Sequence, residues 1–168
     1  MVNDQIPEDT STISDLPVEM KTRRAAREWA LRLLYAHELS GYTIDHVADD
    51  VLDGAHEDQN LRFCRSLAKR VADKDVLIDS LIKSAVEKWD LNRIAVLDHI
   101  ILRIAIAEFL YFDDIPFKVT INEAIELAKR YSTAQSGRFV NGILDAVSTE
   151  LRKKLPKSKD VAEGISPP

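Results

Sequence analysis

Cysteine is nearly absent from this chain: Cys64 is the only one among 168 residues. An internal disulfide or a cysteine-based zinc cluster therefore cannot form. The four histidines, His37, His46, His56 and His99, never stand four residues apart, so no metal site on one helix face is indicated. Glycine and proline are few and no low-complexity tract occurs, which is typical of a folded globular chain. We expect one compact domain without a bound metal.

The sequence also lacks a long hydrophobic run. Its most apolar stretch, Ile100 to Phe112, is interrupted by Arg103 and Glu108 and is shorter than the roughly 20 residues that span a bilayer. The first nineteen residues contain no Lys or Arg, whereas a signal peptide begins with positive charge. The sequence therefore predicts no membrane segment and no export, and its single cysteine fits a reducing cytoplasm.

The motifs of common enzyme sites are missing. The sequence has no GxxxxGK[ST], GxGxxG or HExxH segment, so phosphate-loop, dinucleotide and zinc-protease chemistry lack their minimal residues. Asp49, Asp50 and Asp53 do not have the ligand spacing of a calcium loop. Cys64 falls on an apolar helical stripe, which favours an inert core thiol over a nucleophile. We expect a binding protein that is not an enzyme and needs no cofactor.

Hydrophobic residues recur at helical spacing along most of the chain, and strand-like alternation is absent. The pattern predicts helices at about 26–39, 44–52, 92–112, 121–131 and 137–153, and either one long helix or two between about 59 and 87. Thr43 is the expected N-cap of segment 44–52, and Thr120 with Glu123 reads as a capping box for segment 121–131. The almost wholly apolar segment 92–112 should lie at the centre. The predicted fold class is an all-α bundle of six or seven helices.

Charge and composition divide the chain into three parts. Residues 1–19 form an acidic leader with five carboxylates, residues 20–154 form the helical domain, and residues 155–168 form a polar tail that ends in Ser-Pro-Pro. We expect the leader and the tail to be flexible. The leader carboxylates could fold back on the adjacent arginines and compete with a polyanion. A leader that serves only solubility is the alternative.

Positive charge gathers directly after the leader. Lys21, Arg23, Arg24 and Arg27 lie at the start of the first predicted helix. Positive side chains at this end oppose the helix dipole, and Arg23 and Arg27 repel each other at a spacing of four residues. An external phosphate backbone would relieve both penalties. The stretch indicates a contact with RNA or DNA, and a solvated basic helix face is the alternative.

A second candidate contact lies in the segment 135–142, at the start of the last predicted helix. Unpaired amides at a helix N-terminus can bind phosphate, and Ser136 is a suitable N-cap. Arg138 adds charge, Phe139 offers a ring on which a base could stack, and Asn141 could bond to a base edge. The alternative is that Phe139 belongs to the core and Asn141 is a surface amide.

Four segments of the sequence form an ordered set of motifs. They are RRAARE with the following Leu-Tyr, ILRIA with Glu108, PFKVTINEAIELAK and FVNGILD, within residues 23–35, 101–108, 116–129 and 139–145. Together they resemble the NusB family of transcription antitermination factors, over about residues 20–153. The resemblance implies two three-helix units, RNA binding and partnership with NusE, a ribosomal protein that also acts in antitermination.

The resemblance also implies a biological role and site residues. In this family the pair with NusE binds the boxA element of nascent RNA and joins the complex that keeps RNA polymerase from terminating early, notably on ribosomal RNA operons. By position, the motifs implicate Arg23, Arg24, Arg27, Arg138 and Phe139 in RNA binding. Two alternatives stay open: a helical protein adaptor whose RNA contact is incidental, and a homodimer of the free protein.

Two charged residues of these motifs have a structural interpretation. Arg103 and Glu123 lie in apolar or capping contexts, so we expect a partly buried ion pair or a cap at these positions in place of a ligand contact. Removing one partner of such a pair would leave a buried charge unmatched.

Overall fold

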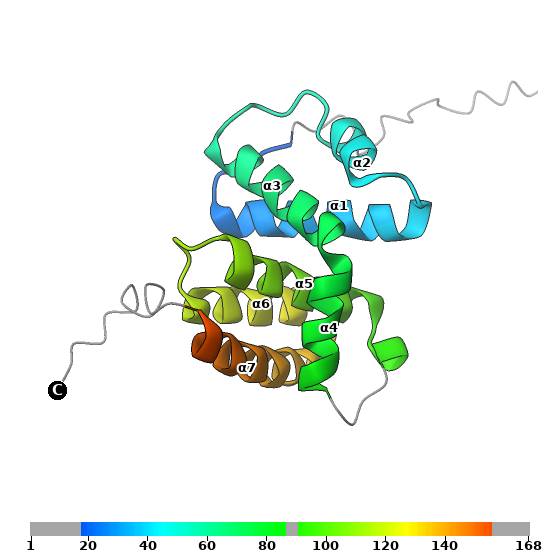
Figure 1. Ribbon diagram of the computed structural model, residues 1–168. Helices are drawn as coiled ribbons and strands as arrows, with labels where there is room; N and C mark the ends of the chain where they lie inside the picture. Colours follow the sequence, from blue (N-terminus) through cyan, green and yellow to red (C-terminus); the bar gives the residue numbers. More distant parts are fainter. Residues whose placement is uncertain (1–17, 87–90, 156–168) are drawn as a thin grey trace, which may run out of the picture.

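The computed structural model describes residues 18–86 and 91–155, which form seven α-helices and one short 3-10 helix and contain no strand (Figure 1). The helices are α1 Arg23–Ser40, α2 Ile44–Val51, α3 Gln59–Asp73, α4 Asp75–Ala85, α5 Val96–Tyr111, α6 Phe117–Tyr131 and α7 Ser136–Lys154, with the 3-10 helix η2 at Leu91–Arg93. The predicted all-α class is confirmed. Residues 1–17 of the acidic leader and residues 156–168 of the tail lie outside the described residues.

The helices are arranged as two units of three. Helices α1, α2 and α3 pack on one another in the first unit, and α5, α6 and α7 do so in the second (Figure 1). Helix α4 follows α3 and packs on α5 and α7, so it joins the two units. Helix α5 contacts α1, α3, α4, α6 and α7 and is buried on almost every side, as its apolar sequence predicts.

Short polar residues and glycine set the helix ends in the first unit. Thr22 caps α1 by accepting a hydrogen bond from the Ala25 amide at 3.1 Å, and Gly41 ends the helix with a φ of 72°. Thr43 caps α2 as expected. The helical conformation is interrupted at Lys74, between α3 and α4, so two helices occupy the region between residues 59 and 85.

The core extends through both units. Phe109 of α5 and Phe117 of α6 pack edge to face, with ring centroids 4.7 Å apart. Cys64 on α3 is fully buried, and burial raises the pKa of its thiol to about 12. The thiol therefore stays protonated at neutral pH, which agrees with the inert core thiol that the sequence predicts.

The predicted capping box at Thr120 and Glu123 is wrong. Helix α6 begins at Phe117 with Pro116 as its N-cap, so both residues lie inside the helix. The early start places the Phe117 ring in the core. Thr120 is buried one turn later, and its hydroxyl donates to Glu108 at 3.3 Å.

The predicted N-cap role of Ser136 is also wrong. Helix α7 begins at Ser136 itself, with Gln135 at the N-cap position. The Ser136 side chain is buried, and its hydroxyl donates to Asp98 on α5 at 2.9 Å. A tertiary hydrogen bond therefore takes the place of the local cap.

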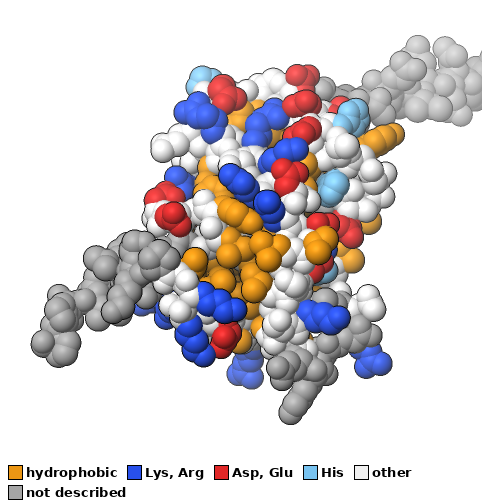
Figure 2. All heavy atoms as spheres, viewed as in Figure 1, with side chains coloured by type: hydrophobic (Ala, Val, Ile, Leu, Met, Phe, Trp, Pro, Cys, Tyr) orange, Lys and Arg blue, Asp and Glu red, His pale blue; other side chains and the backbone are white. Residues whose placement is uncertain are grey.

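The surface carries charges of both signs around exposed hydrophobic side chains. On the face viewed in Figure 2, a band of hydrophobic side chains runs down the middle of the molecule, with basic and acidic side chains on either side. No helix among the described residues is long and apolar enough to cross a membrane. The described part of the chain also holds no cluster of three or more His, Cys, Asp or Glu side chains suited to a metal ion.

Candidate nucleic-acid interface

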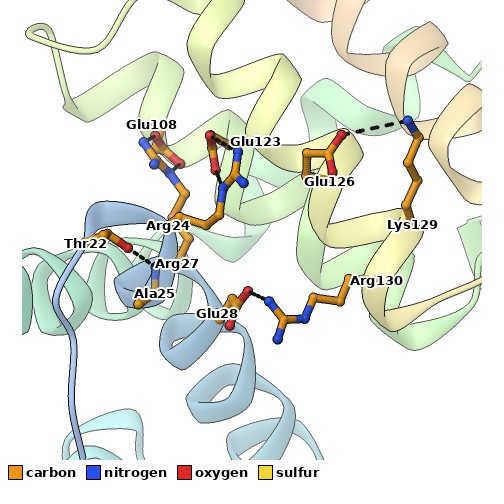
Figure 3. A network of polar contacts seen from close by, with 10 residues as sticks. All are labelled: Thr22, Arg24, Ala25, Arg27, Glu28, Glu108, Glu123, Glu126, Lys129 and Arg130. Carbon is orange, nitrogen blue, oxygen red and sulfur yellow. Dashed lines mark hydrogen bonds and ion pairs between the residues drawn. The ribbon is translucent and has the colours of Figure 1, made fainter.

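Arg27 lies inside the molecule, where α1 packs on α5. Its side chain donates two hydrogen bonds to Glu108, from Nε at 2.9 Å and from Nη2 at 2.7 Å (Figure 3). The residue is 4% exposed. The prediction that Arg27 belongs to an exposed basic face is therefore wrong. Its side chain extends from α1 towards α5 in the second helical unit, where the buried carboxylate of Glu108 neutralises its charge.

Arg24 lies on the surface but has an internal partner. Its Nε and Nη2 atoms each donate to a carboxylate oxygen of Glu123 on α6 at 3.0 Å (Figure 3). The hydrogen bond to Glu123 raises the pKa of Arg24. The Arg24 side chain remains 58% exposed, whereas that of Glu123 is mostly covered. Glu123 therefore forms the partly buried ion pair expected of it, and Arg24 keeps free donor edges towards solvent.

The other basic residues of this stretch are also paired. Arg23 lies 3.3 Å from the Asp114 carboxylate and 4.4 Å from the centre of the Phe63 ring. Lys21 is exposed and lies 3.1 Å from Glu19. The positive charges at the start of α1 therefore have carboxylate partners within the chain, so no external anion is needed to offset them.

A reversed pair continues the contact between α1 and α6. Arg130 on α6 donates to Glu28 on α1 at 2.6 Å, so each helix supplies one arginine and one glutamate (Figure 3). In both pairs the glutamate is mostly covered and the arginine is mostly exposed. These two ion pairs therefore join α1 to α6, while their arginine side chains remain exposed to solvent.

The start of α7 presents a more open set of side chains. Arg138 and Asn141 are exposed, and Phe139 is half-buried against the core. Among the described residues, no carboxylate forms an ion pair with Arg138. The first two turns of α7 therefore combine an available cation, a half-buried aromatic residue and a surface amide, which suits contact with a nucleic acid.

Helix α6 lies between the two predicted regions. Its Glu123 binds Arg24 of α1, and its Lys129 packs beside Gly137 of α7, where an added Cβ would lie 3.6 Å from the lysine side chain. We call the exposed side chains of Arg24, Lys129, Arg130 and Arg138 the basic face. Lys129 and Arg130 were not predicted as site residues, because only the tertiary fold places the last turn of α6 beside the other two segments.

A separate surface carries exposed hydrophobic side chains. Tyr35 and Leu39 lie on the second half of α1, and Val76 and Leu77 lie on the first turn of α4. Val76 is 80% exposed. Residues of α1, α3, α4 and α5 line a hollow of about 150 Å³, and two of them, Glu38 and Asp75, directly precede Leu39 and Val76 in the chain. Arg103 lines the same hollow and forms a half-buried ion pair with Asp79, as its sequence context predicts.

Comparison with known proteins identifies the family. The model of the NusB family matches residues 24–149. A transcription antitermination protein NusB of Chloroherpeton thalassium is 45% identical over 139 residues, which cover 79% of this chain and 64% of that protein. The NusB of Natranaerobius thermophilus is 39% identical over 136 residues, which cover 79% of this chain and 98% of the relative.

Solved structures show the same fold. The structure of T. maritima NusB is 36% identical, has a TM-score of 0.72 and covers 82% of this chain and 100% of its own. A structure of the antitermination factors NusB and NusE in complex with dsRNA has a TM-score of 0.70 at 22% identity, which shows likeness of fold. By sequence and by fold, the chain belongs to the NusB family of transcription antitermination proteins.

Proposed function

We propose that this protein binds the boxA element of nascent RNA together with NusE and supports processive transcription, notably of ribosomal RNA operons. Membership of a family of antitermination proteins, which are not enzymes, supports this role. The observation that carries the RNA contact is the first turn of α7, where Arg138 is exposed and Phe139 is only half-buried.

The proposed RNA path crosses the basic face from α7 to α1. Arg138 lies in the first turn of α7, and Lys129 of α6 packs against that turn at Gly137. Arg130 and Arg24 continue the positive charge along the contact between α6 and α1. Asn141 follows on the same helix as Phe139. Phosphate contacts by the cations position a flexible strand, whereas stacking on Phe139 and a hydrogen bond from Asn141 can distinguish bases. Arg27 takes no part in this contact, because it is buried.

RNA titration with purified variants tests this contact. Arg138→Ala should weaken binding to boxA RNA and to unrelated RNA alike and should reduce the salt dependence of affinity, since it removes one phosphate contact. Arg24→Ala should act in the same direction.

Phe139→Ala should cost about 1–3 kcal/mol of binding free energy if a base stacks on the ring. Lys83→Ala, which removes an exposed lysine of α4 outside the basic face, is the control.

NusE is the proposed protein partner, and the exposed hydrophobic surface of α1 and α4 is its proposed contact. Isolated apolar side chains on a surface are common, but Leu39 and Val76 lie on two different helices, and the residues directly before them, Glu38 and Asp75, line the same hollow. Exposed apolar side chains on neighbouring elements are typical of a protein interface. It lies on other elements than the start of α7, so the two proposed contacts do not use the same residues.

A matched pair of valines tests the NusE contact. Val76→Ser should weaken NusE binding by about tenfold, because a well-packed apolar side chain at an interface contributes on this scale. Val119→Ser changes an exposed valine on α6 and should have no effect. Equal NusE affinity of both variants and the unmodified protein would exclude this surface.

The same measurements separate RNA binding from a protein adaptor with incidental RNA contact. Affinity for boxA RNA is measured with and without NusE for the unmodified protein, Arg138→Ala and Phe139→Ala. A loss in both variants supports RNA recognition by this chain. Equal RNA binding by all three proteins would favour the adaptor, whose function would then depend on NusE alone.

A further inference from the structure

A buried cluster of polar groups lies under the start of α7. Asp98, in the first turn of α5, is 7% exposed, and its Oδ2 accepts a hydrogen bond from Ser136 Oγ at 2.9 Å. The same serine oxygen lies 3.0 Å from Ser132 Oγ and 2.9 Å from Thr133 Oγ1, and it accepts a bond from the Thr133 amide at 3.3 Å. One hydroxyl therefore connects α5 and the loop after α6 to the first residue of α7.

This cluster is costly if it serves stability alone. Asp98 Oδ1 is buried and has no hydrogen-bond partner among the described residues. An unsatisfied buried oxygen costs free energy, and an apolar pair of similar volume would avoid that cost. What the cluster provides is a fixed position for the N-terminus of α7, with the Asp98 carboxylate near the positive end of the helix dipole.

Gly137 lies where this helix start packs against α6. A Cβ at this position would lie 3.6 Å from side-chain atoms of Ile125 and Lys129, so the backbone of α7 approaches α6 closely. Ser136 therefore bonds the first turn of α7 to α5, and at Gly137 the same turn packs against α6. The next residues, Arg138 and Phe139, consequently follow a helix start that is bonded to one helix and packed against another.

We propose that Ser136 and Asp98 are positioning residues for RNA binding: their buried hydrogen bond sets the direction in which Arg138 and Phe139 meet the RNA. This inference rests on the proposed RNA contact at the start of α7. It assigns a role to two residues that do not themselves touch the RNA. It also explains why α7 begins with a serine that bonds to another helix in place of one that caps its own.

Ser136→Ala tests the proposal without changing the charge of the protein. Affinity for boxA RNA, measured with NusE present, should fall by about five- to tenfold, which corresponds to the loss of roughly one hydrogen bond. Ser148→Ala is the matched control, because Ser148 is also a buried serine of α7 but bonds to the Asp145 carbonyl of its own helix. Thermal unfolding shows that each variant is folded at the assay temperature.

Two substitutions of Asp98 test whether RNA affinity depends on the hydrogen bond between Asp98 and Ser136. Asp98→Asn keeps an acceptor for the Ser136 hydroxyl and should bind RNA within about twofold of the unmodified protein. Asp98→Ala should match Ser136→Ala. If Ser136→Ala does not fold, Ser136→Cys keeps the side-chain volume, replaces the hydroxyl with a weakly bonding thiol, and should show the same loss.

The outcomes distinguish this inference from the proposed function. Unchanged RNA binding by Ser136→Ala, together with a clear loss in Arg138→Ala, would overturn the positioning role and leave the RNA contact standing. Equal losses in Ser136→Ala and Ser148→Ala would attribute the effect to stability and would also overturn it. Unchanged binding by Arg138→Ala would instead contradict the proposed RNA contact.

Discussion

Arg27 and Glu108 form an ion pair that is almost completely shielded from solvent, with side-chain exposures of 5% and 1%. Glu108 also accepts a hydrogen bond from the Thr120 hydroxyl, so residues of three helices meet at one carboxylate. Burying two charges costs nearly as much free energy as their attraction returns. The pair therefore specifies how the two helical units dock more than it adds to their stability, and the cost becomes visible when one partner is removed.

Arg27→Met should lower the free energy of unfolding by about 3–5 kcal/mol, because the Glu108 carboxylate is then buried without its partner. Urea unfolding followed by circular dichroism measures the change. The double variant Arg27→Met with Glu108→Leu removes both charges and should recover most of the loss. A single variant as stable as the unmodified protein would show that the pair is not buried in solution.

Glu123 occupies two donor positions of Arg24, so it competes with any phosphate for the same guanidinium group. Glu123→Gln should therefore raise the affinity for RNA by about two- to fivefold, since it frees an arginine of the basic face and removes a negative charge beside it. Filter binding or fluorescence anisotropy at low salt measures the affinity.

Glu150→Gln is the control for charge alone, because Glu150 is an exposed glutamate of α7 that pairs with Lys153. It makes the same change in net charge without freeing an arginine. A gain in both variants of equal size would show a general electrostatic effect. A loss in Glu123→Gln would mean that Glu123 aligns Arg24 for RNA.

Helices α4 and α5 are joined by a polar cluster at their contact. Arg103 donates to Asp79 through Nε at 2.9 Å and Nη2 at 2.7 Å, and His99 Nε2 lies 2.8 Å from the same carboxylate. Burial by itself would raise the pKa of Asp79, but the hydrogen bonds from Arg103 and His99 outweigh it and hold the pKa below its usual value of 3.8. The folded protein therefore binds this proton less readily than the unfolded chain.

This pKa shift predicts an acid-sensitive attachment of α4. The Asp79 pair stabilises the fold at every pH above the ordinary aspartate range and loses this contribution as pH falls through the lowered pKa. Asp79→Asn should reduce the free energy of unfolding by roughly 1–3 kcal/mol at pH 6, as expected for charged hydrogen bonds. The difference in the free energy of unfolding between this variant and the unmodified protein should become smaller below about pH 4. Urea unfolding between pH 2.5 and 6 measures it, and a constant difference would contradict the assignment.

The whole protein has a formal net charge of −5, which opposes binding to RNA at long range. Four of its carboxylates, Asp4, Glu8, Asp9 and Asp15, lie in residues 1–17, directly before the basic stretch. The described residues begin close behind them, where Val18 packs against the core and Met20 is buried. A truncation after residue 17 therefore removes acidic charge and leaves these two core contacts in place.

Removal of residues 1–17 should raise the affinity for RNA by about two- to tenfold at low salt, because the leader carboxylates then no longer compete for the basic face. The gain should shrink as ionic strength rises and charges are screened. RNA titration at several salt concentrations, with matched thermal unfolding, makes the comparison. Equal affinity of the full-length and truncated proteins at low salt would leave the leader a solubilising role only.

The sequence by itself determined the helices and the family. Apolar periodicity depends on neighbours within one or two turns, so it located the helical regions, the central position of α5 and the burial of Cys64, but it left open whether one helix or two lie between about residues 59 and 87. The ordered motifs also indicated the NusB family. Helix starts were less certain, because Phe117 and Ser136 are held by tertiary contacts that override local caps.

Only the tertiary structure decided which charges are available. Three arginines of the same type lie within five residues, at positions 23, 24 and 27. Arg23 pairs with Asp114 and Arg24 pairs with Glu123 at the surface, whereas Arg27 is buried against Glu108. Their partners stand more than 80 residues away along the chain, so no local pattern reveals them. An ion pair requires atoms within a few ångströms, and only the packing of α1 against α5 and α6 brings these groups together.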